Sequence, residues 1–94
     1  MIQAQIMTAN ANVIQLVRQD EMFEYGKGIM VMWPRGGLTM VSFNEENGDR
    51  DGLEYLLKQV EEMCPNCQEY KIVQAYNKLK LVGNYSSINV KVRN

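Results

Sequence analysis

The residues with the clearest potential for chemistry are two cysteines three positions apart, Cys64 and Cys67, in the stretch Cys-Pro-Asn-Cys. Two thiols at this spacing can form a redox pair, supply half of a metal site, or fill positions in a hydrophobic core. The choice depends on where the motif lies relative to the helices, because a helix terminus changes the pKa of a nearby thiol.

The segment before the motif is predicted to be an amphipathic helix over residues 51–64. Its apolar residues recur at the spacing of one helix face: Leu53, Leu56, Leu57, Val60, Met63 and Cys64. Asp51 and Glu54 form a capping pattern at its start, and Pro65 ends it. Cys64 therefore lies at a helix C-terminus, where the dipole disfavours a thiolate, whereas redox motifs of this kind place the reactive thiol at an N-terminus. The redox interpretation is not supported.

The same four residues resemble one knuckle of a zinc ribbon or the apex of a zinc hook. The resemblance implies a zinc ion with four ligands, but the chain has no third cysteine and no histidine. Zinc would have to be shared between two chains through Cys64 and Cys67, or be completed by Glu61, Glu62 or Glu69. The alternative is that Cys64 belongs to the core and Cys67 to a turn. We expect no cofactor, with shared zinc as the alternative.

The absence of histidine narrows the possible functions further. Histidine is the commonest general base and metal ligand, so catalytic arrangements of Ser/His/Asp or Cys/His cannot form within this chain. No pair of acidic residues has a spacing that suggests a carboxylate mechanism. We therefore expect a protein that is not an enzyme.

The remaining segments predict one α+β domain over residues 1–94. A hairpin is expected from strands 28–33 and 38–43 around the turn at 34–37. Further strands are expected over these ranges: 2–8, 69–76, 78–82 and 88–92. Residues 12–18 can be a strand, or they can begin a helix that runs to about residue 23.

We favour the strand, which gives an antiparallel β-sheet with one long amphipathic helix on one face. With the helix, the order becomes a ferredoxin-like β-α-β-β-α-β arrangement plus a C-terminal hairpin.

The central hairpin predicts a protein interface. Strand 28–33 is apolar on both faces, and one helix can cover only one face of a small sheet. Methionine, tryptophan and arginine are enriched at interfaces between proteins. The predicted interface residues are Met30, Met32, Trp33, Arg35 and Met40. We expect the other face to be covered by a second copy of the chain, by another protein, or by both in turn.

Charge distribution offers a different hypothesis. Residues 45–69 contain eight acidic and two basic residues, whereas residues 70–94 contain five basic residues and no acidic ones. Tyrosines lie between these bases, as stacking residues do on sheets that bind nucleic acid. The residues predicted for this alternative are Lys71, Lys78, Lys80, Lys91, Arg93 and Tyr85. The competing interpretation is an edge hairpin whose lysines prevent aggregation.

No apolar run approaches the roughly 20 residues needed to span a bilayer, and glutamines interrupt the apolar residues near Met1. We expect a cytoplasmic protein, complete from Met1, with no membrane partner. Its expected role is that of a small adaptor, regulator or inhibitor. The content of Asn, Lys, Met and Tyr suits an AT-rich source such as a bacteriophage, in which case the partner would be a host protein.

Overall fold

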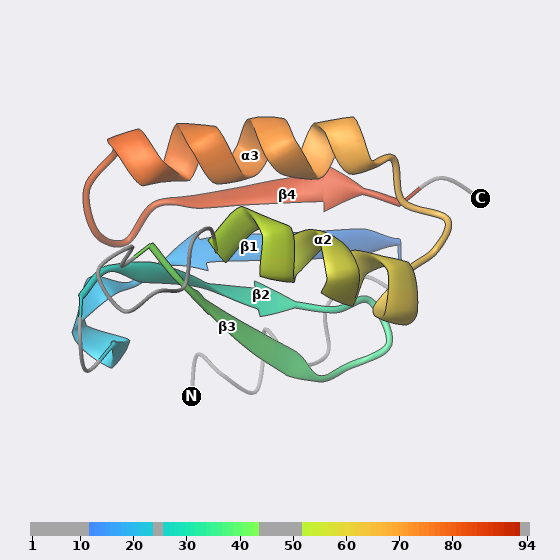
Figure 1. Ribbon diagram of the computed structural model, residues 1–94, viewed down its shortest axis with the longest axis horizontal. Helices are drawn as coiled ribbons and strands as arrows, with labels where there is room; N and C mark the ends of the chain where they lie inside the picture. The colour runs from blue at the N-terminus through green and yellow to red at the C-terminus, as the bar shows by residue number, and fades with distance from the viewer. Residues whose placement is uncertain (1–11, 24–25, 44–51, 93–94) are drawn as a thin grey trace.

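The computed structural model describes residues 12–23, 26–43 and 52–92. Its elements follow this order: β1 (Val13–Arg18), a 3-10 helix (Asp20–Met22), β2 (Gly28–Met32), β3 (Leu38–Ser42), α2 (Gly52–Met63), α3 (Glu69–Leu81) and β4 (Ser87–Lys91). The four strands form one antiparallel sheet in the order β3-β2-β1-β4 (Figure 1). The predicted α+β class with an antiparallel sheet is confirmed.

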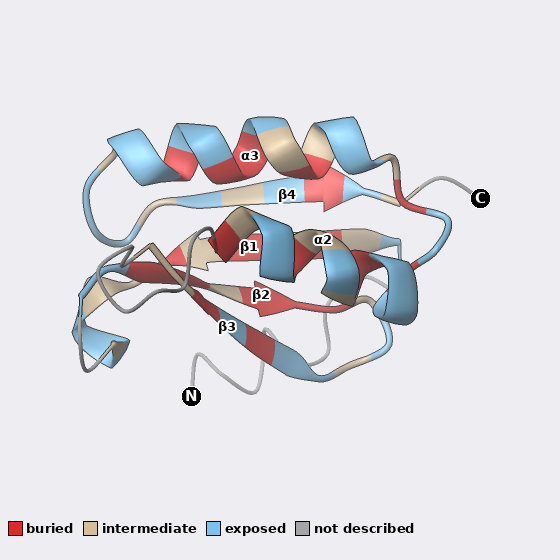
Figure 2. Cartoon of the chain, viewed as in Figure 1, coloured by how far each residue is buried: buried red, intermediate tan, exposed pale blue. Residues whose placement is uncertain are grey.

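Both helices pack on the same face of this sheet (Figure 1). Side chains alternate between the two faces along each strand, and the alternation is clearest in β1, where every second residue is buried. The core lies between the sheet and the helices (Figure 2). Its fully buried side chains include Ile14, Leu16, Ile29, Val31, Val41, Leu56, Val60, Ile72, Tyr76 and Leu79.

The central hairpin and the helix after it form as the sequence predicts. Gly36 and Gly37 in the β2–β3 turn have φ angles of +97° and +101°, a region that glycine enters without steric cost. At the start of α2, a Cβ atom on Gly52 would lie 2.2 Å from the carbonyl oxygen of Ser42. Only glycine lets the helix begin this close to β3.

The segment after the cysteines differs from the prediction. Two strands were expected over 69–76 and 78–82, but residues 69–81 form the single helix α3. Its buried residues are Ile72, Ala75, Tyr76 and Leu79, which lie on one helical stripe. Burial of this stripe against the sheet outweighs the strand-like alternation of lysine and leucine at 78–81. The C-terminal hairpin and the single-helix arrangement were therefore wrong, since β4 pairs with β1 instead.

The ferredoxin-like alternative is not confirmed. It required a helix over residues 12–23, and the structure has β1 and the short 3-10 helix there. β4 covers residues 87–91, one position earlier than predicted, and the expected strand 2–8 lies outside the described residues. Within the described part of the chain, neither helix is long and apolar enough to cross a membrane.

One charged residue lies inside the core, and it joins the sheet to α3. The side chain of Arg18 at the end of β1 is only 5% exposed. Its Nη1 atom donates hydrogen bonds to the carbonyl oxygens of Leu79, at 2.8 Å, and Lys80, at 3.0 Å. It also donates to the carbonyl of Val82. These carbonyls carry the negative end of the helix dipole, so a buried cation is favoured at this position.

The other side of the Arg18 guanidinium is neutralised by a carboxylate. Nε lies 3.0 Å from Oδ1 of Asp20, and Nη2 lies 3.2 Å from Oδ2. These hydrogen bonds hold the pKa of Asp20 below its usual value. The ring of Phe43 lies 5.4 Å from the guanidinium carbon, which adds a cation–π contact. Every charge-bearing group of Arg18 therefore has a partner.

Replacing Arg18 with methionine keeps a side chain of similar length with an apolar stem. It removes the guanidinium, so the α3 carbonyls and Asp20 lose their hydrogen-bond donor. We expect Arg18→Met to lower the free energy of unfolding by about 2–4 kcal/mol. The measurement is urea denaturation followed by circular dichroism. Arg35→Met at the exposed hairpin turn is the control and should change stability by about 0.5 kcal/mol or less. Equal effects of the two substitutions would contradict the role of Arg18.

The lowered pKa of Asp20 makes part of the stability depend on pH. A carboxyl whose pKa is lower in the folded state stabilises that state above its unfolded pKa of about 3.9. This contribution is lost as pH falls through the lower, folded value. Wild type should therefore exceed Asp20→Asn in stability at pH 7, and the gap should close in acid. Urea denaturation at several pH values measures the gap, and a gap that persists unchanged in acid would contradict this role of Asp20.

Candidate functional site

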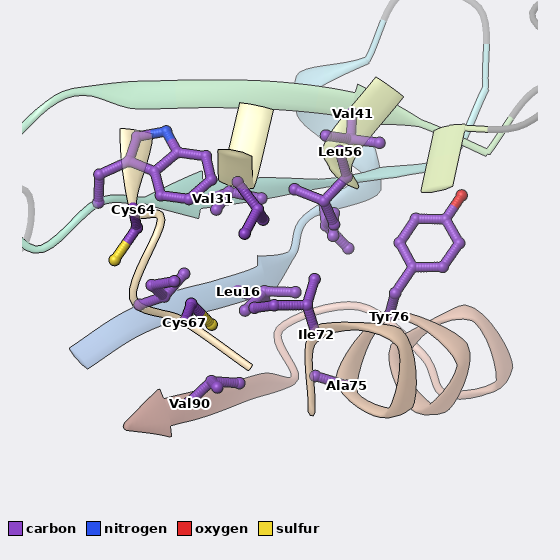
Figure 3. Packing of buried hydrophobic residues seen from close by; sticks show 14 of the residues in the cluster. Leu16, Val31, Val41, Leu56, Cys64, Cys67, Ile72, Ala75, Tyr76 and Val90 are labelled. Carbon is purple, nitrogen blue, oxygen red and sulfur yellow. The ribbon is translucent and has the colours of Figure 1, made fainter. Parts of the chain in front are cut away.

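The two cysteines lie in the hydrophobic core. Each is 8% exposed, and both belong to the buried cluster between the sheet and the helices (Figure 3). The turn that connects α2 to α3 is closed by a hydrogen bond from the backbone N–H of Cys67 to the carbonyl of Cys64, at 3.1 Å. The prediction that Cys64 is a core residue and Cys67 part of a turn describes this arrangement, except that Cys67 is buried as well.

Burial also determines the chemistry of the thiols. Desolvation raises the pKa of Cys64 and raises that of Cys67 to about 11. Neither thiol is therefore activated as a nucleophile at neutral pH, since nucleophilic attack requires the thiolate. Among the described residues, no group of three or more Cys, Asp or Glu side chains is arranged to hold a metal ion. The geometry gives the motif a packing role.

The five residues predicted for a protein interface fall into three places. Met30, Met32 and Met40 lie on the sheet face opposite the helices. Trp33 is 4% exposed on the helix side, where its Nε1 donates a hydrogen bond of 2.8 Å to Oγ1 of Thr39. Arg35 is exposed in the β2–β3 turn. Thus only the methionines share one surface.

We call the sheet face that points away from α2 and α3 the open face. Its strand positions are Val13, Gln15, Val17, Gly28, Met30, Met32, Leu38, Met40, Ser42, Ser87, Asn89 and Lys91. Lys91 is the one charged residue among them. Met32 is buried and Met30 is half-buried, whereas Leu38 and Met40 on β3 are 51% and 40% exposed. The exposed apolar part of this face therefore lies on β3.

The residues predicted to bind nucleic acid do not form one surface. Lys71 and Lys78 lie on the side of α3 nearest β4. They line the same groove as Lys91 of β4. Lys80 lies on another side of α3, with its Nζ atom 5.8 Å from the centre of the Tyr76 ring. Tyr85 donates a hydrogen bond of 2.7 Å to the Glu21 carboxylate, which raises the pKa of Tyr85. Arg93 lies outside the described residues.

The structure brings three lysines together in a groove between α3 and β4. The groove has a volume of about 410 Å³ and is lined by Lys71, Gln74, Ala75, Lys78, Ile88, Asn89, Val90 and Lys91. We call it the α3–β4 groove. None of these three lysines forms an ion pair with a described carboxylate. It is therefore a basic groove whose charge is not compensated within the described part of the chain.

Several residues of these surfaces were not singled out from the sequence. Leu38 alternates with Met40 along β3, a signal that places both on one face. Gln74 and Asn89 could not be assigned to the groove, because the helical state of 69–81 was not recognised. Arg18 gave no signal at all, since its carbonyl partners are more than 60 positions away in the sequence.

The burial of the cysteines can be tested by thiol modification. At pH 8, the thiolate fraction of Cys67 should be about 100-fold below that of a free thiol, because its pKa is about 11 instead of 9.0. We expect the native protein to react with Ellman's reagent far more slowly than N-acetylcysteine and to react fully in denaturant. The variants Cys64→Ser and Cys67→Ser assign the rates. Rapid reaction of both thiols in the folded protein would contradict the packing role.

No protein-family model matches this chain, and no curated protein or solved structure matches it significantly. A function must therefore be argued from the chain's own geometry, in which two surfaces stand out: the apolar part of the open face and the α3–β4 groove.

Proposed function

We propose that this chain is a non-enzymatic protein-interaction module that associates with a second copy of itself through the open face. The observation that carries the proposal is the exposure of Leu38 and Met40 on a face with one charged residue among its twelve strand positions. Interface centres are depleted of charged residues and enriched in methionine.

The arrangement of the open face supports the same proposal. Its apolar side chains lie on β1, β2 and β3, which also contribute the polar residues Gln15 and Ser42, and all three positions of β4 are polar: Ser87, Asn89 and Lys91. An apolar centre with a polar rim is typical of interfaces that exclude water at the middle. Both described helices are already packed on the other face. Within the described residues, no element of the chain lies over Leu38 and Met40.

The contribution of the central strand is smaller than its sequence suggests. Ile29, Val31 and Trp33 are buried on the helix side, and Met32 is buried as well. These residues do not need a partner to leave water. The exposed edge strand β3 therefore carries most of the proposed contact, with Met30 beside it. A role as an adaptor, regulator or inhibitor would follow if the same face alternates between a second copy and another protein.

The test is Met40→Glu, which places a carboxylate at the proposed contact. Since Met40 is 40% exposed, the single chain should remain folded. We expect sedimentation equilibrium over protein concentrations up to about 1 mM to show a wild-type dimer. Met40→Glu should raise the dimer dissociation constant at least tenfold.

The matched control is Tyr55→Glu, at a position 47% exposed on α2, and it should leave the dimer unchanged. Circular dichroism checks that both variants are folded. A wild-type protein that stays monomeric throughout, or a dimer that Met40→Glu does not weaken, would refute self-association through this face.

A further inference from the structure

The α3–β4 groove lies along an edge of the sheet with which no other described strand pairs. β4 is the last strand in the order β3-β2-β1-β4, and among the described residues it pairs with β1 alone. Figure 1 shows α3 running alongside β4 at this end of the sheet. The groove is lined by four consecutive residues of β4, 88–91. Consecutive residues point to opposite faces, so a groove that reaches all four follows the edge of the strand.

The backbone groups that face this edge can be identified from the hydrogen bonds to β1. Val92 N–H donates to the carbonyl of Asn12 at 2.6 Å, and Arg18 N–H donates to the carbonyl of Ser86 at 2.8 Å. Bonding alternates along an antiparallel pair, so the even-numbered residues of this segment face β1. The N–H and C=O groups of Ser87, Asn89 and Lys91 therefore point outward, where another strand can pair with them.

The side chains above this edge are basic. Lys71 and Lys78 are seven residues apart on α3, which separates them by about 10.5 Å along the helix axis. An extended peptide places alternate side chains about 6.7 Å apart on one face. Acidic residues at alternate positions of such a peptide lie within reach of both flexible lysine side chains. Lys91, at the end of β4, also lines the groove, although its side chain belongs to the open face.

From this geometry we propose that the α3–β4 groove binds an extended acidic segment of a partner protein, which adds to the sheet as a strand beside β4. Backbone pairing with the outward groups of Ser87, Asn89 and Lys91 would hold the segment, and Lys71 and Lys78 would select acidic side chains. Among the described residues, no aromatic side chain lines the groove, and single-stranded nucleic acid usually stacks on such side chains. A peptide fits the groove better.

The first experiment uses a fluorescent, end-blocked heptapeptide, Thr-Glu-Val-Glu-Val-Glu-Thr, measured by anisotropy with the full chain. We expect it to bind, more weakly as salt rises, and a version with lysines in place of glutamates not to bind. Two further versions carry N-methyl groups on the glutamate nitrogens or on the valine nitrogens. Strand addition requires one of these two sets of N–H groups, so at least one version should lose binding.

The second experiment locates the site. In ¹⁵N-labelled protein, the peptide should shift the amide signals of Ser87, Asn89 and Lys91 and slow their exchange with solvent. The double variant Lys71→Glu/Lys78→Glu should bind the peptide at least tenfold more weakly. The control Lys27→Glu/Lys58→Glu makes the same change in net charge at exposed positions away from the groove and should bind within about twofold of wild type.

Several results would overturn the proposal. One is binding of both N-methylated peptides as tightly as the unmodified peptide, because it would show attraction by charge without strand addition. The same measurement is made with a labelled single-stranded oligothymidine. If the protein binds neither the peptide nor the oligothymidine, the proposal is wrong. If it binds the oligothymidine alone, the groove is assigned to nucleic acid instead. If the double variant does not fold, the N-methyl peptides and the amide signals of the wild-type protein still decide the matter.

Discussion

The buried guanidinium of Arg18 is the constraint on which the rest of the structure depends. A cation taken out of water is costly unless its partners replace the lost hydration. Here the partners are three carbonyls at the C-terminal end of α3 and the carboxylate of Asp20. Because Arg18 ends β1, beside both β2 and β4, this interaction fixes the end of α3 over the sheet. The α3–β4 groove exists because α3 is held there.

The position of α3 also explains why the two sheet faces differ. With α2 and α3 on one face, the stripe of Ile72, Ala75, Tyr76 and Leu79 completes a core that the sheet and α2 could not close alone. The open face receives no helix from the described residues. It nevertheless carries apolar side chains on three strands and one charged residue, whereas solvent-exposed positions are usually rich in charged residues. This difference between the faces supports the proposed binding role.

The α+β class, α2 and the β2–β3 hairpin could be predicted because each has a clear local signal, whereas the sequence of β1 only favoured a strand over a helix. The signal for α3 was ambiguous. Leu79 and Leu81 alternate with lysines as in a strand, while Ile72, Ala75, Tyr76 and Leu79 also match a helical stripe. Tertiary packing decides between the two-residue spacing of a strand and the helical spacing. A single sequence does not show which of these apolar residues contact the core. The predicted interface set also contained Trp33 and Arg35, which the structure places apart from the three methionines, and the groove could not be predicted without α3.

The two edge strands of the sheet differ in charge, and so do the two proposed surfaces, the open face and the α3–β4 groove. The edge strand β3 reads Leu-Thr-Met-Val-Ser and contains no charged residue, whereas the edge strand β4 ends in Lys91 beside Lys71 and Lys78. Two copies that met at their β4 edges would bring these lysines together, and like charges disfavour such pairing. Two copies that met through β3 would face no such repulsion. In the proposed scheme, the lysines that disfavour self-pairing at β4 attract an acidic strand there, while the open face, whose exposed apolar residues lie on β3, is left for a second copy of the chain.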